Sequence, residues 1–315
     1  MPSAATRDAF GKALAEIGER FPQVVALDAD LAKSTKSEHF AKKFPERFFE
    51  MGIAEANMCA TAAGLALAGK IPFACSFACF ITGQFAEIRI AVAYSQAPVR
   101  LVGTHAGVAI GEDGHSQMGL EDIALMRTLP GMAVIQPADD LETAAAVEHL
   151  VKNVGGPAYL RLTRQKVDRV HADGYKFQFG KVDTLRAGDD VAILATGGPV
   201  KAALDAAEKL AGEGLSVRVV NVHTIKPLDA DGIEKIAREC GRIVTVEDHT
   251  VMAGMGGAVC EAVADRHPVP VRRLGVQDVF GESGSPEDLI KKFGLDAESI
   301  AESTRAFCRA TSAAV

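Results

Sequence analysis

The chain repeats one pattern, in which a short and strongly apolar run is followed by a longer segment with helical periodicity. Residues 23–28 (QVVALD), 98–103 (PVRLVG) and 191–195 (VAILA) carry few charges, which is typical of strands buried in a parallel sheet. Between such runs, apolar residues recur at helical spacing, as in the segment 5–20. Strands joined by helical crossovers predict an α/β fold that binds its ligands at the carboxyl ends of the strands.

The pattern is interrupted once, between residues 165 and 181, where periodicity is lost and charged residues and glycine increase. Such a segment is typical of a domain linker. We therefore expect two doubly wound domains: residues 1–170 with a mostly parallel sheet, a linker at 171–185, and a smaller domain at 186–315. The 315 residues are enough for two separate cores.

Composition restricts the partners and the compartment. The formal net charge is −7, and the chain has no Trp and three Tyr, so we expect no nucleic-acid partner. No charge-free run reaches the roughly 18 residues of a membrane span, and the first 20 residues lack the apolar core of a signal peptide. Six cysteines without a Cys-x-x-Cys pair are expected to be free thiols. These features predict a cytoplasmic protein without a membrane partner.

Glu55 is the single charged residue between Glu50 and Lys70. It lies in a predicted helix, 52–69, that is apolar nearly all round and is therefore expected to be buried. A carboxyl group removed from water favours its protonated form and is suited to donate that proton. A glutamate that simply stabilises a helix N-terminus would occupy the same position. The spacing alone does not separate these two interpretations.

Two further segments carry candidate binding groups. Phe77 and Phe80 lie at the end of an apolar run, where they can either hold a flat ring or pack in the core. The loop 104–117 follows a predicted strand and contains two imidazoles, two carboxylates, an amide and three glycines. Its spacing matches no zinc pattern, so we expect no metal site. Hydrogen bonding and acid–base chemistry toward a polar substrate fit these side chains better.

Several of these segments, taken in order, resemble the C-terminal half of transketolases. Residues 53–58 (IAEANM) are similar to the glutamate motif of that family, and residues 111–122 (GEDGHSQMGLED) are similar to its substrate loop. Residues 5–7 (ATR) and 28–35 (DADLAKST) also match. The resemblance spans nearly the whole chain. It implies a pyrimidine-binding domain to about residue 169, followed by the C-terminal domain of the family.

The resemblance implies thiamine diphosphate as cofactor and a role for each site residue. Glu55 would hydrogen-bond the pyrimidine ring nitrogen of the cofactor, and Phe80, helped by Phe77, would pack on that ring. One group would bind the sugar hydroxyls and the oxygen of the reacting carbon, and another would bind a terminal phosphate. The first group is His105, Asp113 and Gln117; the second is Arg7, Ser34 and Arg164. His105 is expected to be catalytic together with Glu55, and Gln117 to contact the cofactor as well.

The chain departs from the family at two points. His115 stands where many transketolases have proline, and His115-Ser116-Gln117 also resembles the beta subunit of pyruvate-dehydrogenase-type decarboxylases. His115 is therefore either a substrate-binding residue or a loop residue that contacts solvent. The chain also contains no Gly-Asp-Gly motif, which in full-length transketolases precedes the asparagine that binds magnesium and diphosphate. The resemblance thus implies a split enzyme, a heterotetramer in which a separate N-terminal subunit holds Mg²⁺.

Three functions stay open at this point. The first is transfer of a two-carbon ketol unit between phosphorylated sugars. The second is the role of a beta subunit of a 2-oxo-acid dehydrogenase or of a deoxyxylulose-phosphate synthase-like enzyme. The third is a non-catalytic regulatory subunit. Glu55 argues against the third, because a buried carboxylate without a partner is costly to retain.

Overall fold

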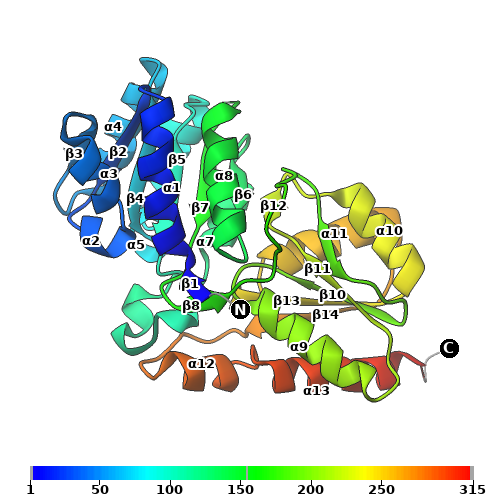
Figure 1. Cartoon of the computed structure of the whole chain (residues 1–315). Coiled ribbons are helices and arrows are strands. Elements are labelled where there is room, and N and C mark those ends of the chain that lie inside the picture. Colours follow the sequence, from blue (N-terminus) through cyan, green and yellow to red (C-terminus); the bar gives the residue numbers. More distant parts are fainter. Residues whose placement is uncertain (1–2, 154, 313–315) are drawn as a thin grey trace.

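A computed structural model describes residues 3–153 and 155–312, which form two α/β units side by side (Figure 1). The first contains a seven-stranded sheet in the order β12-β6-β7-β5-β4-β2-β3. Neighbouring strands are parallel except at the edge, where β12 is antiparallel to β6. The strands are β2 (Val24–Asp28), β3 (Phe48–Glu50), β4 (Ile71–Phe77), β5 (Arg100–Thr104), β6 (Ala133–Ile135), β7 (Ala158–Arg161) and β12 (Thr224–Lys226).

Helices cover both faces of this sheet, which explains why its strands are apolar without interruption. On one face α1 (Thr6–Arg20) and α8 (Asp140–Lys152) pack together over side chains such as Val24. On the other face lie α4 (Glu55–Leu67), the π-helix η2 (Ile88–Tyr94) and α7 (Asp122–Thr128), over side chains such as Val25. Successive residues of β2 therefore enter different cores, as the strand period of two requires.

The second unit has a five-stranded sheet in the order β14-β13-β10-β11-β9, parallel except for β9. Helices α9 and α13 pack on one face, and α10 and α11 on the other. The elements are β9 (Asp183–Arg186), β10 (Val191–Ala195), α9 (Pro199–Ala211), β11 (Val217–Asn221), α10 (Ala230–Cys240), β13 (Ile243–Thr250), α11 (Met255–Arg266), β14 (Val271–Val276), α12 (Pro286–Lys292) and α13 (Ala297–Ser312).

The predicted α/β class with two doubly wound sheets is confirmed, but the chain crosses between the units more than the sequence suggests. β12 lies well beyond the predicted linker, yet it completes the first sheet. β8 (Lys166–Asp168), in the segment that loses periodicity, pairs with β1 (Ser3–Ala5). One apolar cluster also runs from α4 and β2 of the first unit to α10 and α11 of the second. The two units therefore share part of their core.

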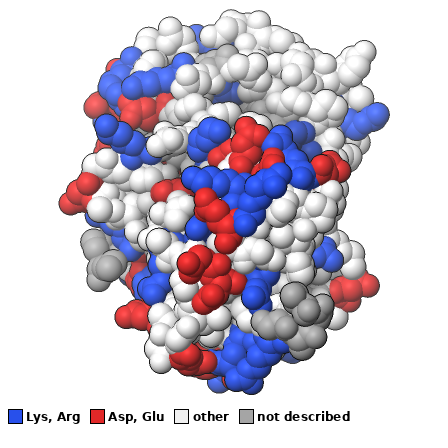
Figure 2. Space-filling view, turned by 90° about the vertical axis from the view of Figure 1, so that its right-hand side faces the viewer, with Lys and Arg blue, Asp and Glu red and all other residues white. Residues whose placement is uncertain are grey.

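Charged side chains of both signs are mixed over the surface that carries α10, the side that faces the viewer in Figure 2. Arg266 contacts Asp231 and Glu234, and Arg238 contacts Glu234 at 2.8 Å, so these charges form exposed ion pairs. Exposed pairs of this kind contribute little to stability. Within the described ranges, no helix combines the length and low charge needed to cross a membrane.

Candidate active site

The candidate site lies at the end of the first sheet where the parallel strands have their carboxyl ends. The segments that follow β2, β4, β5 and β7 leave this edge together, because these strands are parallel. They are the short helices α2 (Ala32–Thr35) and α5 (Ala78–Thr82), the loop with the 3₁₀ turns η3 (Val108–Asp113) and η4 (His115–Gln117), and the turn at Arg164. The N-terminus of α1, with Arg7, reaches the same edge.

His105 is at the centre of this arrangement. It follows β5 with a φ of +56°, a conformation that costs energy for a residue with a β-carbon and that is often found at functional sites. Its ring stacks on Phe77 at a centroid distance of 3.8 Å. Nδ1 lies 2.8 Å from Thr104 Oγ1, and Arg7 Nη1 lies 2.7 Å from Nε2. Because a guanidinium only donates, Nε2 must accept and Nδ1 carries the proton.

The environment of His105 keeps its ring neutral. Burial, and to a smaller extent the nearby cations Arg7, Arg164 and Lys36, lower the pKa of His105 to about 3. The ring therefore acts as a hydrogen-bonding group and not as a cation at neutral pH.

Asp28 organises the turn that follows β2. Its carboxylate accepts from Leu31 N–H at 2.7 Å, from Thr35 Oγ1 at 2.6 Å and from Ser37 Oγ at 2.8 Å. Burial raises the pKa of Asp28 to about 6, although these hydrogen bonds oppose the rise. The turn places the backbone oxygen of Ser34 3.0 Å from Arg7 Nη1. Asp28 thus holds the turn that brings Ser34 to Arg7, the two residues that were predicted to bind a phosphate.

Three cations face the same space. Burial, and then the charge of Arg164, lowers the pKa of Arg7, so no acidic partner fully compensates that guanidinium. Arg164 Nη1 donates to Ile110 O at 2.6 Å and lies 3.3 Å from Asp113 Oδ2. Lys36, with a φ of +71°, lies 3.8 Å from Asp8 and close enough to influence His105. Such a group of cations suits a phosphate or another small anion.

The second unit fixes the loop that carries Asp113. Asp248, at the end of β13, accepts a hydrogen bond from Val108 N–H at 2.8 Å. Gly107 has a φ of +86°, and a β-carbon there would lie 2.0 Å from Asp248 Oδ2. Only glycine allows this close approach. Asp248 was not among the residues singled out from the sequence, because nothing local indicates which loop a strand-end carboxylate will reach.

The predicted aromatic residues are also at this edge. The rings of Phe77 and Phe80 are 5.5 Å apart and inclined by only 7°, and Phe80 is half-buried. The Cys79 thiol, which lies between them in the sequence, donates to the backbone oxygen of Gln117 at 3.2 Å and so ties the loop 104–117 to α5. A flat ring can therefore be held close to Gln117.

Glu55 is the first residue of α4 and is partly exposed. The expectation that this helix is buried on most sides does not hold for the single chain. Its residues Asn57, Ala60, Gly64 and Leu67 form an exposed stripe, and Leu67 is 65% exposed. The apolar residues of α4 therefore lie partly in the core and partly on a surface that is exposed in the single chain.

His115 contacts the second unit. Its Nδ1 accepts from Gly281 N–H at 3.1 Å, and its ring lies 4.4 Å from the ring of Phe280. It is therefore not simply a solvent-facing loop residue. Hydrogen bonds join Arg7 to Ser34 and His105, and an ion pair joins Arg164 to Asp113. Arg164 is also close enough to lower the pKa of both Arg7 and His105, so the two sets share one site, whereas His115 contacts the second unit.

Lys36 is the cation that the sequence analysis missed. It lies two residues beyond Ser34 and directly after the matched segment 28–35, so its position in the sequence was a signal. A lysine in a turn is usually solvated, however, and only the folded chain shows that this one is close enough to lower the pKa of His105.

Comparison with known proteins places the chain in a class defined by two consecutive domains. The pyrimidine-binding domain of transketolase matches residues 2–169, and the transketolase C-terminal domain matches residues 180–300. The chain therefore belongs to the transketolase family. It contains the pyrimidine-binding and C-terminal domains of that family, as the resemblance implied.

Two relatives cover almost the same length as this chain. One is named "Putative transketolase C-terminal section", from Methanocaldococcus jannaschii, with 44% identity over 94% of both chains. The other is the 6-deoxy-6-sulfo-D-fructose transketolase subunit SqwH of Clostridium sp. (strain MSTE9), with 41% identity over 93% of this chain and 91% of that one. A solved structure described as "Split gene transketolase, inactive beta4 tetramer" is 45% identical, with a TM-score of 0.89, over 96% of this chain and 97% of that chain. The chain is thus a transketolase-type subunit.

Proposed function

We propose that this chain is one subunit of a split transketolase that transfers a two-carbon ketol unit between phosphorylated sugars. The observation that carries the proposal is the grouping of Arg7, Lys36 and Arg164 around a neutral His105, next to the stacked pair Phe77 and Phe80. A cationic end for a terminal phosphate and a flat platform for a cofactor ring thus share one edge of the sheet.

The described residues fit the pyrimidine end of thiamine diphosphate. When bound, this cofactor supplies a nucleophilic carbon for the carbonyl group of the ketose. Phe80 and Phe77 would support the pyrimidine ring, and Glu55 would hold a proton at its ring nitrogen. Among the residues described, no group of three or more His, Cys, Asp or Glu can hold a metal ion. Because the sequence lacks the Gly-Asp-Gly motif of the family, we assign Mg²⁺ and the diphosphate to an N-terminal partner subunit.

The remaining residues would orient the sugar. Nε2 of His105 is an acceptor, so a sugar hydroxyl can replace Arg7 there and release that guanidinium for the phosphate. Asp113 and Gln117 would hydrogen-bond the other hydroxyls and the oxygen of the reacting carbon. Arg164, already next to Asp113, would link the hydroxyl-binding loop to the phosphate end. We also keep His115 as a substrate-binding residue in this proposal.

Self-association is part of the proposal. The exposed stripe of α4 is continued by the neighbouring η2, on which Ile90 is 56% and Tyr94 84% exposed, and Ile53 before α4 is 82% exposed. Large apolar side chains on two packed helices favour burial against another chain. We propose that a second copy covers this face, which would also bury Glu55, and that two partner subunits complete a heterotetramer. The six free cysteines are compatible with the cytoplasm.

We expect the isolated chain to be folded but inactive and to bind thiamine diphosphate weakly. The strongest charge interactions of the cofactor involve its magnesium-bound diphosphate, for which the described residues offer no ligand cluster. The chain would be assayed alone and with an N-terminal transketolase subunit, by calorimetry for cofactor and by ketol transfer between phosphorylated sugars. Full activity of the chain alone would disprove the split enzyme, and pyruvate decarboxylation without ketol transfer would disprove the proposed reaction.

Arg164→Ala is expected to raise KM for phosphorylated substrates by about 10- to 100-fold, because a charge-assisted hydrogen bond to phosphate contributes about 1.5–3 kcal/mol. Lys36→Met should act in the same direction with a smaller effect. Unphosphorylated analogues should be almost unaffected in both variants. A sulfonated ketose should be included, because it presents a similar terminal anion.

The matched control for these variants is Arg266→Ala, since Arg266 is an exposed arginine of α11 in ion pairs far from the site along the chain. Steady-state kinetics of the assembled enzyme gives KM and kcat separately. Equal losses for phosphorylated and unphosphorylated substrates would mean that Arg164 has only a structural role.

A further inference from the structure

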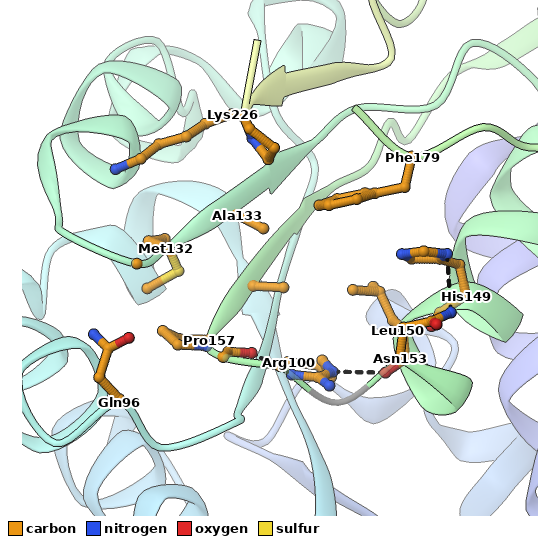
Figure 3. Close-up of a pocket in the computed structure, with 15 residues that line it drawn as sticks. Gln96, Arg100, Met132, Ala133, His149, Leu150, Asn153, Pro157, Phe179 and Lys226 are labelled. Carbon is orange, nitrogen blue, oxygen red and sulfur yellow. Dashed lines mark hydrogen bonds between the residues drawn. The ribbon is translucent and has the colours of Figure 1, made fainter. Parts of the chain in front are cut away.

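A cavity lies at the other end of the first sheet, where the strands β5, β6 and β7 begin. Its volume is about 780 Å³. Arg100, Ala133 and Ala158, the first residues of these strands, line it together with the end of α8. Phe179 from the linker and Lys226 from β12 supply the other wall (Figure 3). The candidate active site is at the carboxyl ends of the same strands, so this cavity is separate from it.

Arg100 gives the cavity a buried positive charge. The side chain is 1% exposed, and it donates from Nε to Leu150 O at 2.9 Å and from Nη1 to Gly156 O at 2.7 Å. In the part of the chain that the structure describes, Nη2 has no hydrogen-bond partner. Burial lowers the pKa of Arg100 to about 10, and no carboxylate counteracts this. A buried cation without an acidic partner is costly, and a bound anion would compensate it.

The other charged groups of the cavity do not provide that compensation. No Asp or Glu is among its described lining residues, which include His149 and Lys226. The Lys226 ammonium donates to Arg127 O at 2.8 Å and to Leu129 O at 2.5 Å, and it points away from Arg100 in Figure 3. The cavity is therefore positive, and Nη2 of Arg100 is a buried donor without a partner among the described residues.

One wall of the cavity is flat. The rings of His149 and Phe179 are 4.7 Å apart and nearly parallel, with an interplanar angle of 20°. Met132 and Pro157 lie across from them, with Arg100 below, as Figure 3 shows. Apolar and aromatic walls with few polar groups are typical of sites for small organic ligands. A lone inorganic anion would leave most of the volume empty.

We propose that this cavity binds a small anion that carries a planar ring, with the anionic group directed to Arg100 and the ring against Phe179. A phosphate or a carboxylate can supply the anionic group, since a guanidinium binds both through parallel N–H donors. The walls come from the first sheet, the linker and β12. A ligand bound there would therefore hold these parts of the chain together and stabilise the folded protein.

Titration calorimetry with the full chain tests this proposal. The probes are adenosine monophosphate and 2-aminobenzoate as ring-bearing anions, with adenosine and inorganic phosphate as their uncharged and ringless counterparts. We expect at least one ring-bearing anion to bind with a dissociation constant below 1 mM, and the two counterparts to bind at least tenfold more weakly. The tighter of the two anions identifies phosphate or carboxylate. The absence of binding by both would overturn the proposal.

Variants assign the binding to this cavity. Phe179→Ala and Arg100→Met should each lower the affinity for the tighter-binding anion at least tenfold. Circular dichroism would confirm that both variants fold. If Arg100→Met does not fold, Phe179→Ala alone decides. Phe280→Ala, which removes an exposed ring elsewhere, should leave the affinity unchanged, as should Arg164→Ala at the candidate active site. Binding that is lost in Arg164→Ala but retained in Phe179→Ala would show that the probe occupies the active site, and the proposal would be wrong.

Discussion

Glu55→Gln is expected to leave the chain folded and to lower turnover of the assembled enzyme by about 10²- to 10³-fold or more. An amide cannot hold an acidic proton at the pyrimidine nitrogen, and losing a proton-transfer or electrostatic contribution costs about 2–4 kcal/mol in the transition state. Folding should be unaffected because the side chain is partly exposed at the start of α4 in the single chain. Ketol transfer measured with the partner subunit and saturating cofactor gives the effect.

A conservative control is Glu16→Gln, which makes the same chemical change on an exposed position of α1. It should retain full activity. If Glu55→Gln were also nearly fully active under these conditions, Glu55 would have no part in the mechanism. The two units would then share the family fold without using its central carboxyl group.

His171→Ala is expected to lower the free energy of unfolding by about 3–5 kcal/mol, the usual cost of removing one partner of a buried ion pair. His171 lies in the predicted linker, and its ring is buried with Nδ1 2.8 Å from Asp139 Oδ2 and Nε2 3.4 Å from Asp183 Oδ2. Burial alone would lower the pKa of His171, but hydrogen bonding to these carboxylates and the charge of Glu142 raise it to about 10. The same pair holds the pKa of Asp139 at about 2, against the opposing effect of burial.

The pH dependence follows from these shifts. A histidine with a raised pKa contributes its full stabilisation below about pH 6.5, and this contribution is lost as the pH rises toward 10. For Asp139 the contribution is present above about pH 4 and is lost as the pH falls toward 2. Chemical denaturation of the wild-type chain between pH 7 and 10 should therefore show falling stability, and His171→Ala should flatten that dependence.

A suitable control is His267→Gln, at the end of α11, which should change neither the stability nor its pH dependence. An alkaline stability profile that stays the same in His171→Ala would show that the ring is not charged in the native protein. In that case the neutral ring would donate a hydrogen bond to only one carboxylate, that of Asp139, with a much smaller contribution.

The positions of most elements could be predicted from local patterns. The run 191–195 coincides with β10, and the helical segment 5–20 differs from α1 by one residue. Such agreement arises because strands covered on both faces must be apolar throughout, and helices must present one apolar side. β12 could not be predicted in this way. Three residues form it, and their partner in β6 lies almost 90 positions earlier in the chain.

Sequence motifs also identified most of the residues at the candidate site, but not their chemical state. The neutral form of His105 depends on burial and on three cations that come from separate segments. The position of the loop 104–117 depends on Asp248, which reaches Val108 from the other unit. The same limit explains the misjudged burial of α4. Apolar composition requires that a helix be covered, but it does not indicate whether the same chain or a second one covers it.

The sequence by itself therefore determined the α/β class, the order of its elements and the family. Each of these depends on the kinds of residues and on short-range spacing, which the folded chain preserves. The tertiary structure alone decided the protonation of His105, the clamp of Asp248 on the loop, the inclusion of Lys36 among the site cations and the placement of Arg100 in a positive cavity. These features arise because folding brings together segments that are far apart in the chain and removes their charged groups from water. The strength of an electrostatic interaction depends on the distance between the groups and on their desolvation.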